Sequence, residues 1–256
     1  MLSSREARLI RGLRRRKIRE QEGLFLAEGV RVVEDLLASG LPLKVGVVSP
    51  ALEDTPRGTK LARDLEAACP VRRVPDRTLE ELAATETPQG VLVVAQAPRW
   101  ELGELEVGEA AVVLVLDGIQ DPGNFGTLVR TADALGVVAV AALPGTVDPW
   151  NPKSVRSAAG SLFRVPVVQP RFDELAAWLD TQGFTLYAAD AQGAPAEQFE
   201  WSARAALAVG NEGAGLSPEV RRAAAALVSI PIRGGAESLN VGVAAGILLY
   251  LLTRRR

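Results

Sequence analysis

The chain has 256 residues, of which 48% are hydrophobic and 23% are charged, and its formal net charge is −2. This composition is typical of a folded globular protein of one or two domains and excludes a disordered chain. The sequence contains no histidine and a single cysteine, Cys69, which excludes a disulfide framework and any site in which histidine activates a serine or a cysteine. We therefore expect no metal site, and we expect any chemistry to depend on other polar groups and a cofactor. Cys69 is predicted to be a small buried residue.

No part of the sequence predicts a membrane span or a secretory signal. The N-terminus is charged from Arg5 onward, and no apolar segment follows it. The longest apolar run, 239–252, is interrupted by Asn240 and Gly242 and is shorter than the ~20 residues that a spanning helix needs. We interpret this run as a buried helix and expect a cytoplasmic protein.

Positive charge is concentrated at the start of the chain. Residues 1–22 contain eight basic and three acidic side chains, which gives a local net charge of +5. Ser3 and Glu6 have the spacing of a capping box, which predicts a helix from there to about Lys17. Such a helix either attracts RNA phosphate groups or presents an ordinary solvated face, and composition alone favours neither alternative. The candidates for RNA binding are Arg14, Arg15, Arg16 and Lys17.

The first part of the chain alternates strands and helices over a little less than 100 residues. Hydrophobic spacing predicts strands at 24–27, 43–48, 71–74 and 91–96, and helices at 30–38, 59–68 and 79–84. Residues 97–110 contain a proline, two glycines and four glutamates, so we predict a linker there. The sequence therefore predicts a small α/β domain over residues 1–96.

Residues 111–256 are predicted to form a second α/β domain. Apolar runs predict strands at 111–116, 137–143, 165–168, 184–189, 206–209 and 227–232, and helical spacing is found at 125–135, 155–162, 173–181 and 239–252. Strands that are apolar on both faces and separated by helices indicate a parallel sheet covered on both sides. Ligands bind such sheets at the carboxyl ends of the strands. The candidate loops therefore follow Leu116, Leu143, Val209 and Ile232.

The first of these loops, 117–130, joins a buried strand to a helix, as the loop of a dinucleotide-binding site does. Gly123 and Gly126 lack the first glycine of the G-x-G-x-x-G fingerprint, and the next strand ends without an acidic residue that could hold a ribose. Both features disfavour a nucleotide-dependent oxidoreductase, which is one alternative function for an α/β sheet. Taken in isolation, Asn124 can be interpreted as a helix cap and Arg130 as a surface cation.

The second loop, 209–219, contains three glycines within six residues, which let the backbone approach a ligand closely. Ser217 and Pro218 are explained as the cap and first residue of a short helix. Turn chemistry alone does not explain Asn211 and Glu212, and this favours a functional role for them.

The third loop, 230–240, leads directly into the apolar helix predicted at 239–252. Ser238 is a plausible cap for that helix, whereas Asn240 falls inside its first turn. A buried amide is destabilising by ~1–3 kcal/mol unless it is hydrogen-bonded. We therefore expect a polar site beside the start of this helix to supply a partner for Asn240.

Together, and in this order, the three loops resemble the three motifs of the SpoU (TrmH) family of RNA 2′-O-methyltransferases, within the SPOUT superfamily. The resemblance covers residues 116–132, 210–215 and 230–241, and the segment 147–166 is similar to the family as well. More weakly, residues 1–96 resemble the substrate-binding domain that many members carry ahead of the catalytic domain. That domain is similar to a ribosomal-protein fold (L30e-like) that holds RNA turns.

The resemblance implies a SPOUT domain with a deep trefoil knot, S-adenosylmethionine as cofactor, and a homodimer whose site lies near the subunit interface. The helix at 239–252 would form part of that interface. The cofactor contacts that it implies are Gly210, Asn211, Ile230 and Leu239. The catalytic positions that it implies are Asn124, Arg130, Glu212, Ser238 and Asn240. Gly242 departs from the family, which often has a small hydroxyl residue there, and we expect this to affect packing rather than the reaction.

Transfer of a methyl group to a ribose hydroxyl needs an aligned nucleophile and an acceptor for its proton. The family proposal assigns the proton to Arg130, but a guanidinium rarely loses a proton because its pKa lies above ~12. We prefer the interpretation that Arg130 grips a neighbouring phosphate and positions the hydroxyl. Asn124 and Asn240 are expected to fix the loop and the substrate ribose, and Ser238 and Glu212 to hold RNA or the cofactor loop.

The RNA itself is expected to be rRNA, most plausibly 23S rRNA, since the N-terminal domain resembles those of rRNA-directed members. Two alternatives within the same fold are a tRNA 2′-O-methyltransferase and a non-catalytic RNA-binding protein. The presence of Arg130, Glu212 and Asn240 disfavours the non-catalytic alternative, because a site that no longer catalyses the reaction is expected to have lost at least one of them by substitution.

Overall fold

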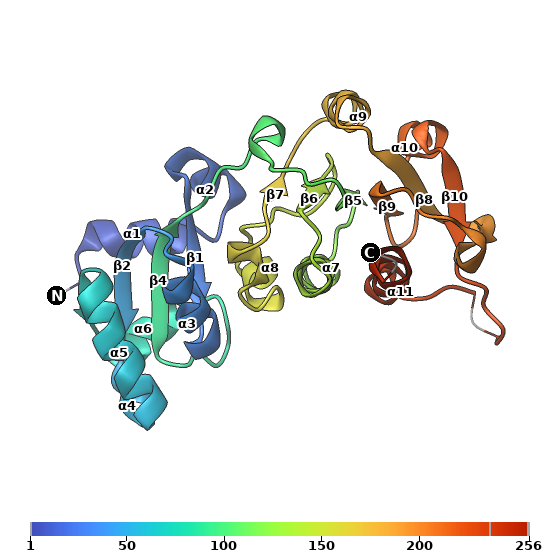
Figure 1. Ribbon diagram of the computed structural model, residues 1–256. Coiled ribbons are helices and arrows are strands. Elements are labelled where there is room, and N and C mark those ends of the chain that lie inside the picture. Colours follow the sequence, from blue (N-terminus) through green and yellow to red (C-terminus); the bar gives the residue numbers. More distant parts are fainter. Residues whose placement is uncertain (1, 236, 255–256) are drawn as a thin grey trace. The chain divides into compact units, whose positions relative to one another are not determined.

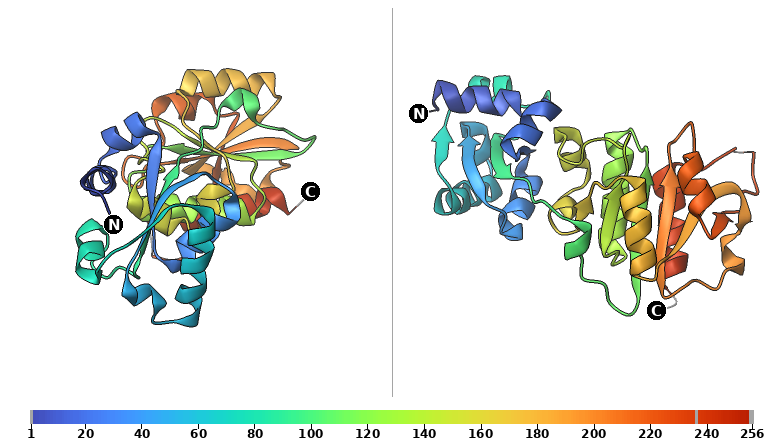
Figure 2. Two further views of the ribbon diagram at one scale, coloured as in Figure 1. Left: turned by 90° about the vertical axis from the view of Figure 1, so that its left-hand side faces the viewer. Right: turned by 90° about the horizontal axis from the view of Figure 1, so that it is seen from above.

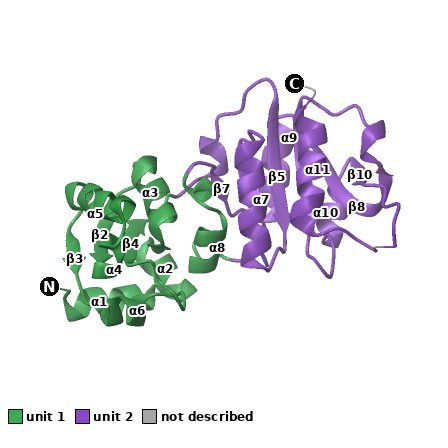
Figure 3. Ribbon diagram, turned by 90° about the horizontal axis from the view of Figure 1, so that it is seen from below, with its two compact units in different colours: residues 1–98, 148–163 green, residues 99–147, 164–256 purple. Residues whose placement is uncertain are grey.

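The computed structural model describes residues 2–235 and 237–254, and it divides into two compact units. Unit 1 comprises residues 1–98 and 148–163, and unit 2 comprises residues 99–147 and 164–256 (Figure 3). The segment 148–163 therefore belongs to unit 1 although it lies between two strands of unit 2 in the sequence.

Unit 1 is built around a four-stranded mixed sheet (Figure 1). The strand order is β1 (Leu24–Glu28), β4 (Val91–Gln96), β2 (Leu43–Val48) and β3 (Val71–Arg73). β4 pairs antiparallel with β1 and β2, and β3 pairs parallel with β2. One face buries a core that includes Ile10, Leu13, Leu26, Leu79 and Leu92. All four strands were predicted from the hydrophobic spacing, and their positions are confirmed.

The helices of unit 1 are α1 (Ser4–Gly12), α2 (Arg16–Glu22), α3 (Val30–Ser39), α4 (Pro50–Glu53), α5 (Pro56–Ala68), α6 (Asp76–Leu82) and α8 (Pro152–Ser157). The capping box is confirmed, because Ser3 Oγ accepts from Glu6 N at 3.2 Å and Glu6 Oε2 accepts from Ser3 N at 2.8 Å. The prediction of one helix reaching Lys17 is wrong. α1 ends at Gly12, and the chain turns so that Leu13 is fully buried before α2 begins.

The segment 148–163 packs against β1 and completes the core of unit 1. The ring of Phe25 lies 4.7 Å from that of Trp150 and 5.6 Å from that of Phe163, measured between centroids. The helix predicted over 155–162 is interrupted, since Ala159 and Gly160 have φ angles of 44° and 80°. α8 therefore ends at Ser157 and a short 3₁₀ turn, Ser161–Phe163, follows.

Unit 2 contains a six-stranded sheet in which every pairing is parallel, as predicted. The strand order is β10 (Ala226–Ser229), β8 (Thr185–Pro195), β9 (Arg204–Gly210), β5 (Ala111–Asp117), β6 (Ala139–Ala142) and β7 (Val167–Val168). Its helices are α7 (Pro122–Ala134), α9 (Phe172–Thr181), α10 (Pro218–Ala223) and α11 (Val241–Thr253), with 3₁₀ turns at Leu102–Glu104 and Ala196–Gln198. α7 and α11 cover one face of the sheet, and α9 and α10 cover the other (Figure 1 and Figure 2).

Three sequence predictions in unit 2 need correction. β8 extends to Pro195 rather than ending at Ala189, and β10 ends at Ser229 rather than reaching Ile232. The terminal helix is not buried all round, because Val243 and Tyr250 are more than half exposed.

Among the described residues, no helix is long and apolar enough to cross a membrane. Cys69 is buried, as predicted.

Candidate functional site

Three loops of unit 2 meet at the carboxyl edge of its parallel sheet and enclose a cavity of about 490 Å³. They follow β5, β9 and β10, and β8 lies between β10 and β9 in the sheet. The strand order therefore brings together loops that are about 90 and 115 residues apart in sequence. Eight of the nine predicted catalytic and cofactor residues line this cavity: Asn124, Gly210, Asn211, Glu212, Ile230, Ser238, Leu239 and Asn240.

A chain of side-chain hydrogen bonds links the three loops. Asn124 Nδ2 donates to Glu212 Oε1 at 2.8 Å, and Asn240 Nδ2 donates to Asn124 Oδ1 at 2.9 Å. Asn240 Oδ1 in turn accepts from the backbone nitrogens of Gly242 and Val243, at 2.9 and 3.3 Å. Because the Glu212 carboxylate can only accept and Asn240 Oδ1 is already engaged, the amide of Asn124 has one orientation that satisfies its donor and its acceptor.

Asn240 is the N-cap of α11, so the predictions of a Ser238 cap and of an amide inside the first turn are wrong. The side chain of Asn240 is exposed rather than buried, although the polar partner expected for it is present in Asn124. Similarly, Asp121 rather than Asn124 caps α7, with Asp121 Oδ1 accepting from Asn124 N at 2.9 Å. Both loops therefore leave an asparagine amide to face the cavity.

The predicted cap Ser217 and first residue Pro218 of α10 are confirmed.

Asn211 holds the second loop against the first. Its Nδ2 donates to Gly118 O at 2.8 Å, and its Oδ1 accepts from the backbone nitrogens of Gly213 and Ala214, both at 2.9 Å. Gly210 is required sterically, because a Cβ there would lie 2.3 Å from the carbonyl carbon of Gly215. The backbone of Gly215 and Leu216 can pack this closely only against a glycine.

The floor beneath the first loop is also fixed by long-range bonds. Asp117, at the end of β5, is buried, and its Oδ2 accepts from Ser217 N at 2.6 Å. Thr146 Oγ1 accepts from Gly118 N at 3.2 Å and donates to Leu116 O at 3.0 Å. These contacts hold the first loop from both sides and so set the position from which Asn124 reaches the cavity.

Arg130 is the predicted catalytic residue that does not line this cavity. It lies on α7, is exposed, and borders a separate shallow hollow with Thr127, Thr131, Gly246 and Tyr250. The close contact of α7 with α11 depends on a small residue at the buried Gly242, where a Cβ would lie 2.8 Å from Thr127 Cγ2. Arg130 therefore belongs to the α7–α11 face, which also carries the exposed apolar residues Val243 and Ile247.

The sequence interpretation missed the part of the cavity wall that comes from β8. Ala189, Asp190 and Ala191 line the cavity because β8 continues past the predicted end of its strand. Asp190 Oδ2 is paired with Arg221 of α10, and its Oδ1 accepts from Gln192 N at 2.8 Å. Ligands bind at the carboxyl ends of parallel strands, and β8 is one of these strands. The same rule therefore indicates the segment after Ala189 as part of the site.

Two of the four basic residues predicted to bind RNA are engaged within unit 1. Arg14 donates to the backbone carbonyls of Glu81, at 3.2 Å, and Ala83, and Arg16 pairs with Glu20 at 2.7 Å. Arg15 and Lys17 are exposed, with no ion pair or side-chain hydrogen bond to any residue that the structure describes.

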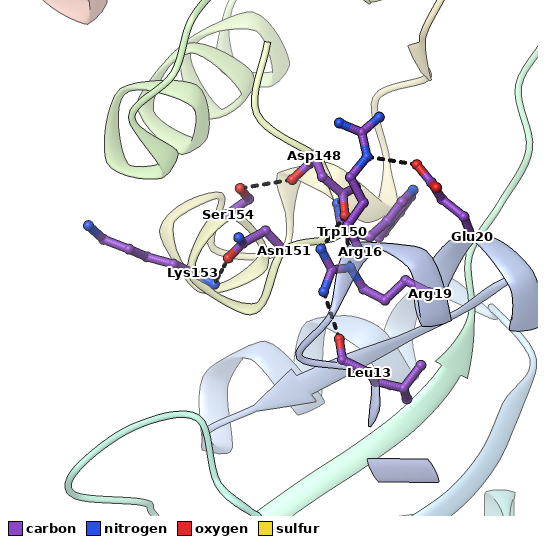
Figure 4. A network of polar contacts seen from close by, with 9 residues as sticks. All are labelled: Leu13, Arg16, Arg19, Glu20, Asp148, Trp150, Asn151, Lys153 and Ser154. Atoms are coloured by element: carbon purple, nitrogen blue, oxygen red, sulfur yellow. Dashed lines mark hydrogen bonds and ion pairs between the residues drawn. The ribbon is translucent and has the colours of Figure 1, made fainter. Parts of the chain in front are cut away.

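The neighbouring Arg19, which was not singled out from the sequence, is 5% exposed and forms a buried ion pair with Asp148 (Figure 4). Arg19 Nε donates to Asp148 Oδ2 at 2.8 Å, and Nη1 donates to Leu13 O at 2.7 Å. Asp148 also accepts from Trp150 N at 3.0 Å, which fixes the start of the segment that contacts Phe25. This network is structural: it joins α2 to the segment 148–163 within unit 1.

Comparison with known proteins bears on both units. Residues 111–250 match the SpoU rRNA Methylase family, and residues 5–93 match the MRM3-like substrate binding domain. The chain is 38% identical, over 94% of its length and 92% of the other protein, to the 23S rRNA (guanosine(2553)-2′-O)-methyltransferase RlmP of Bacillus subtilis.

Solved structures resemble the whole chain. The SpoU methyltransferase AviRb from Streptomyces viridochromogenes, in complex with the cofactor AdoMet, superimposes with a TM-score of 0.90 at 30% identity, covering 99% of this chain and 98% of that one. An AdoMet-bound rRNA methyltransferase from Sinorhizobium meliloti gives a TM-score of 0.88 at 30% identity, covering 100% and 96% of the two chains.

Proposed function

The chain belongs to the SpoU rRNA methylase family, and from that premise we propose that it transfers a methyl group from S-adenosylmethionine to a ribose 2′-hydroxyl of rRNA, with 23S rRNA as the preferred substrate. The observation that carries the proposal is the cavity in which the three family motifs meet and are joined by the Glu212–Asn124–Asn240 bonds. Since rRNA is the substrate, we place the reaction in the cytoplasm.

The cavity fits the cofactor in size and in chemistry. Its volume of about 490 Å³ falls in the ~300–1,000 Å³ range of small-molecule sites, and its walls combine apolar side chains with backbone polar groups. We assign cofactor contacts to Gly210, Asn211, Ile230 and Leu239, all of which line the cavity. S-adenosylmethionine supplies a methyl group on a positively charged sulfur, which an aligned oxygen nucleophile can displace.

We assign the linked polar side chains to substrate positioning. Asn240 Oδ1 is occupied by two α11 amides, so its Nδ2 is directed to Asn124, and Asn124 transmits this constraint to Glu212. Groups held in one geometry before the substrate arrives contribute most to catalysis, because no reorganisation is needed during the reaction. Ser238 is exposed at the rim of the cavity, where it can contact RNA.

We propose a homodimer formed through the α7–α11 face. Val243, Ile247 and Tyr250 are spaced by four and three residues on α11, so they form one exposed apolar stripe. Arg130 borders the same face, and a symmetric pairing would place it at the interface, where it could grip the RNA phosphate next to the target ribose. Ile247→Asp is expected to yield monomers in sedimentation analysis and to lose methyl transfer. Retention of the dimer by this variant would count against the α7–α11 interface.

Three finer features of the architecture are part of the proposal. We divide the chain functionally into an RNA substrate-binding domain at 1–96, a linker at 97–110 and a SPOUT methyltransferase domain at 111–256. The first has a ribosomal-protein (L30e-like) fold, and the last contains a deep trefoil knot in its C-terminal part. The close tie of the second loop to the first, through Asn211 and Gly118, is compatible with such a knot, which an experimentally traced backbone through 210–240 would test.

The experiment that tests the function is methyl transfer from labelled S-adenosylmethionine to unmodified RNA, separated into 23S, 16S and tRNA fractions. The proposal predicts label in 23S rRNA at a phosphodiester bond that resists alkali, since a 2′-O-methyl group removes the hydroxyl that alkaline cleavage needs. Label confined to tRNA would overturn the substrate assignment. Cofactor binding without label in free or ribosomal RNA would overturn the reaction and favour a non-catalytic RNA-binding protein.

A further inference from the structure

A second cavity, of about 230 Å³, lies wholly within unit 1 and plays no part in the reaction proposed above. Its walls come from three separate parts of the chain: the junction of β1 and α3, the loop that precedes β4, and α8. The residues that decide its chemistry are Glu28, Arg31, Thr85, Thr87, Gln89 and Arg156. The cavity is thus formed by the tertiary structure of unit 1, whose residues 5–93 match a substrate-binding domain.

The acidic residue of this cavity is hydrogen-bonded to the loop that precedes β4. Glu28 is 3% exposed, and its carboxylate accepts from Ala84 N at 2.9 Å, from Thr85 N at 3.3 Å and from the hydroxyl of Thr85. A carboxylate that accepts three such hydrogen bonds is well satisfied and repels an anionic ligand less than a free one. Glu28 therefore fixes the loop of the cavity wall, and its charge is partly offset by Arg156, which lines the same cavity.

Two guanidinium groups of the cavity are less completely satisfied. Arg156 Nη1 lies 3.9 Å from Glu28 Oε2, too far for a hydrogen bond, and is a buried nitrogen without a hydrogen-bond partner among the described residues. Arg31 is exposed and forms no ion pair with any residue that the structure describes. An unmet buried donor is destabilising, so an acceptor that enters the cavity gains a favourable interaction.

The remaining polar groups of the cavity can also donate. Gln89 Oε1 accepts from Val30 N at 2.9 Å, which leaves the amide nitrogen of Gln89 to bind a ligand, and Thr87 is exposed. Gly29 has a φ of 96°, and Gln89 Oε1 lies 3.2 Å from the position that a Cβ would take, so the glycine lets the side chain of Gln89 pack against the start of α3.

We propose that this cavity binds a phosphodiester group of the substrate RNA, with Arg31 and Arg156 as its cationic ligands. The planar guanidinium matches phosphate geometry, and contacts to phosphate fix the register of a nucleic acid on a protein. This inference rests on the proposed function, because it names the part of unit 1 that engages the same RNA. It also gives unit 1 an RNA contact other than the basic cluster near its N-terminus, of which Arg14 and Arg16 are engaged internally.

The salt dependence of RNA binding tests the proposal. The full-length protein is bound to deproteinised 23S rRNA over a series of KCl concentrations, and log K is plotted against log salt. The slope of this plot is negative, and each lost phosphate contact reduces its magnitude by roughly 0.7–0.9. Because both arginines are assigned to one phosphodiester group, Arg31→Gln and Arg156→Gln are each expected to reduce the magnitude of the slope by no more than this amount. Arg63→Gln, an exposed arginine of α5 that does not line the cavity, serves as the control and is expected to keep the wild-type slope.

The outcomes are distinguishable from failure of the proposed function. Arg31→Gln is expected to raise KM for RNA while leaving kcat at saturating RNA and the affinity for S-adenosylmethionine unchanged. A slope equal to that of the wild type in Arg31→Gln would overturn the inference, even if methyl transfer is confirmed. Arg31 is exposed, so this variant decides the question if Arg156→Gln does not fold. Saturable binding of inorganic phosphate that Arg31→Gln abolishes, with an unchanged RNA slope, would assign the cavity to free phosphate instead.

Discussion

In unit 2 the polar side chains of three loops are bonded to one another across a cavity, whereas in unit 1 several arginines of the basic N-terminal region are occupied in holding the unit together. Asn124, Glu212 and Asn240 come from distant parts of the sequence and meet at one edge of a parallel sheet. Arg14 and Arg19, by contrast, bind carbonyls or a carboxylate within their own unit. The difference shows that topology identifies a site more securely than local charge does.

The largest expected effect concerns the buried ion pair of unit 1. Arg19→Met leaves Asp148 without its partner, and loss of one member of a buried pair typically costs about 3–5 kcal/mol of unfolding free energy. Arg16→Met is the matched control, because Arg16 and Glu20 are both more than half exposed and such a pair contributes at most about 0.5 kcal/mol. Urea unfolding monitors both variants. Equal stability losses would contradict the distinction between structural and solvated arginines.

The next effect tests the hydrogen-bonded chain of unit 2. Asn124→Ala removes a donor to Glu212 and an acceptor for Asn240. A hydrogen bond to a charged group contributes about 1.5–3 kcal/mol, so kcat/KM for rRNA is expected to fall roughly tenfold to a hundredfold. Gln120→Ala changes an exposed residue of the same loop and is expected to retain activity. Wild-type kinetics in Asn124→Ala would show that the Glu212–Asn124–Asn240 hydrogen bonds play no part in the reaction.

A smaller effect is expected where a glycine shapes the cofactor cavity. In Gly210→Ala the added methyl group meets the backbone of Gly215 and Leu216, so the loop must shift. Overpacking of this kind costs about 1–3 kcal/mol, and the affinity for S-adenosylmethionine in calorimetric titration is expected to fall roughly tenfold or more. Gly213→Ala has space for its methyl group and is the control. If both variants bind equally well, Gly210 does not shape a cofactor site.

The smallest effect is a pH dependence of stability in unit 1. Hydrogen bonds from Ser3 and Arg72 lower the pKa of Glu6 to about 2, from an ordinary value near 4.5. Because the pKa is lower in the folded state, this stabilisation is present above pH ~4.5 and is lost as the pH falls toward 2. Glu6→Gln should therefore reduce stability at pH 7 and make it less dependent on pH between about 4.5 and 2, measured by urea unfolding. Glu22→Gln, at an exposed position, is the control.

Most of the fold could be predicted from the sequence because its strands are continuous apolar runs. β5 and β9 are buried along nearly their whole length, and their loops converge once the sheet is parallel. The ends of β8 and β10 could not be predicted in the same way, since β10 pairs with β8 through an irregular register between Leu227 and Val228.

Two features that could not be predicted depend on contacts rather than on sequence pattern. Neither hydrophobic spacing nor turn chemistry indicates that Asp148–Phe163 joins unit 1, because this depends on the pairing of Arg19 with Asp148 and of Phe25 with Trp150. The separation of Arg130 from the cavity was equally hidden, since it follows from the direction in which one helix residue points.

We assign to the unit 2 cavity the transfer of a methyl group to a ribose of rRNA. The most direct test incubates unmodified 23S rRNA with the protein and trideuteromethyl-labelled S-adenosylmethionine, followed by mass spectrometry of the nucleosides for the wild type and for Asn240→Ala. We expect one 2′-O-trideuteromethyl nucleoside with the wild type and a much reduced yield with Asn240→Ala under this assignment. Label on a base, or equal labelling by both proteins, would contradict it.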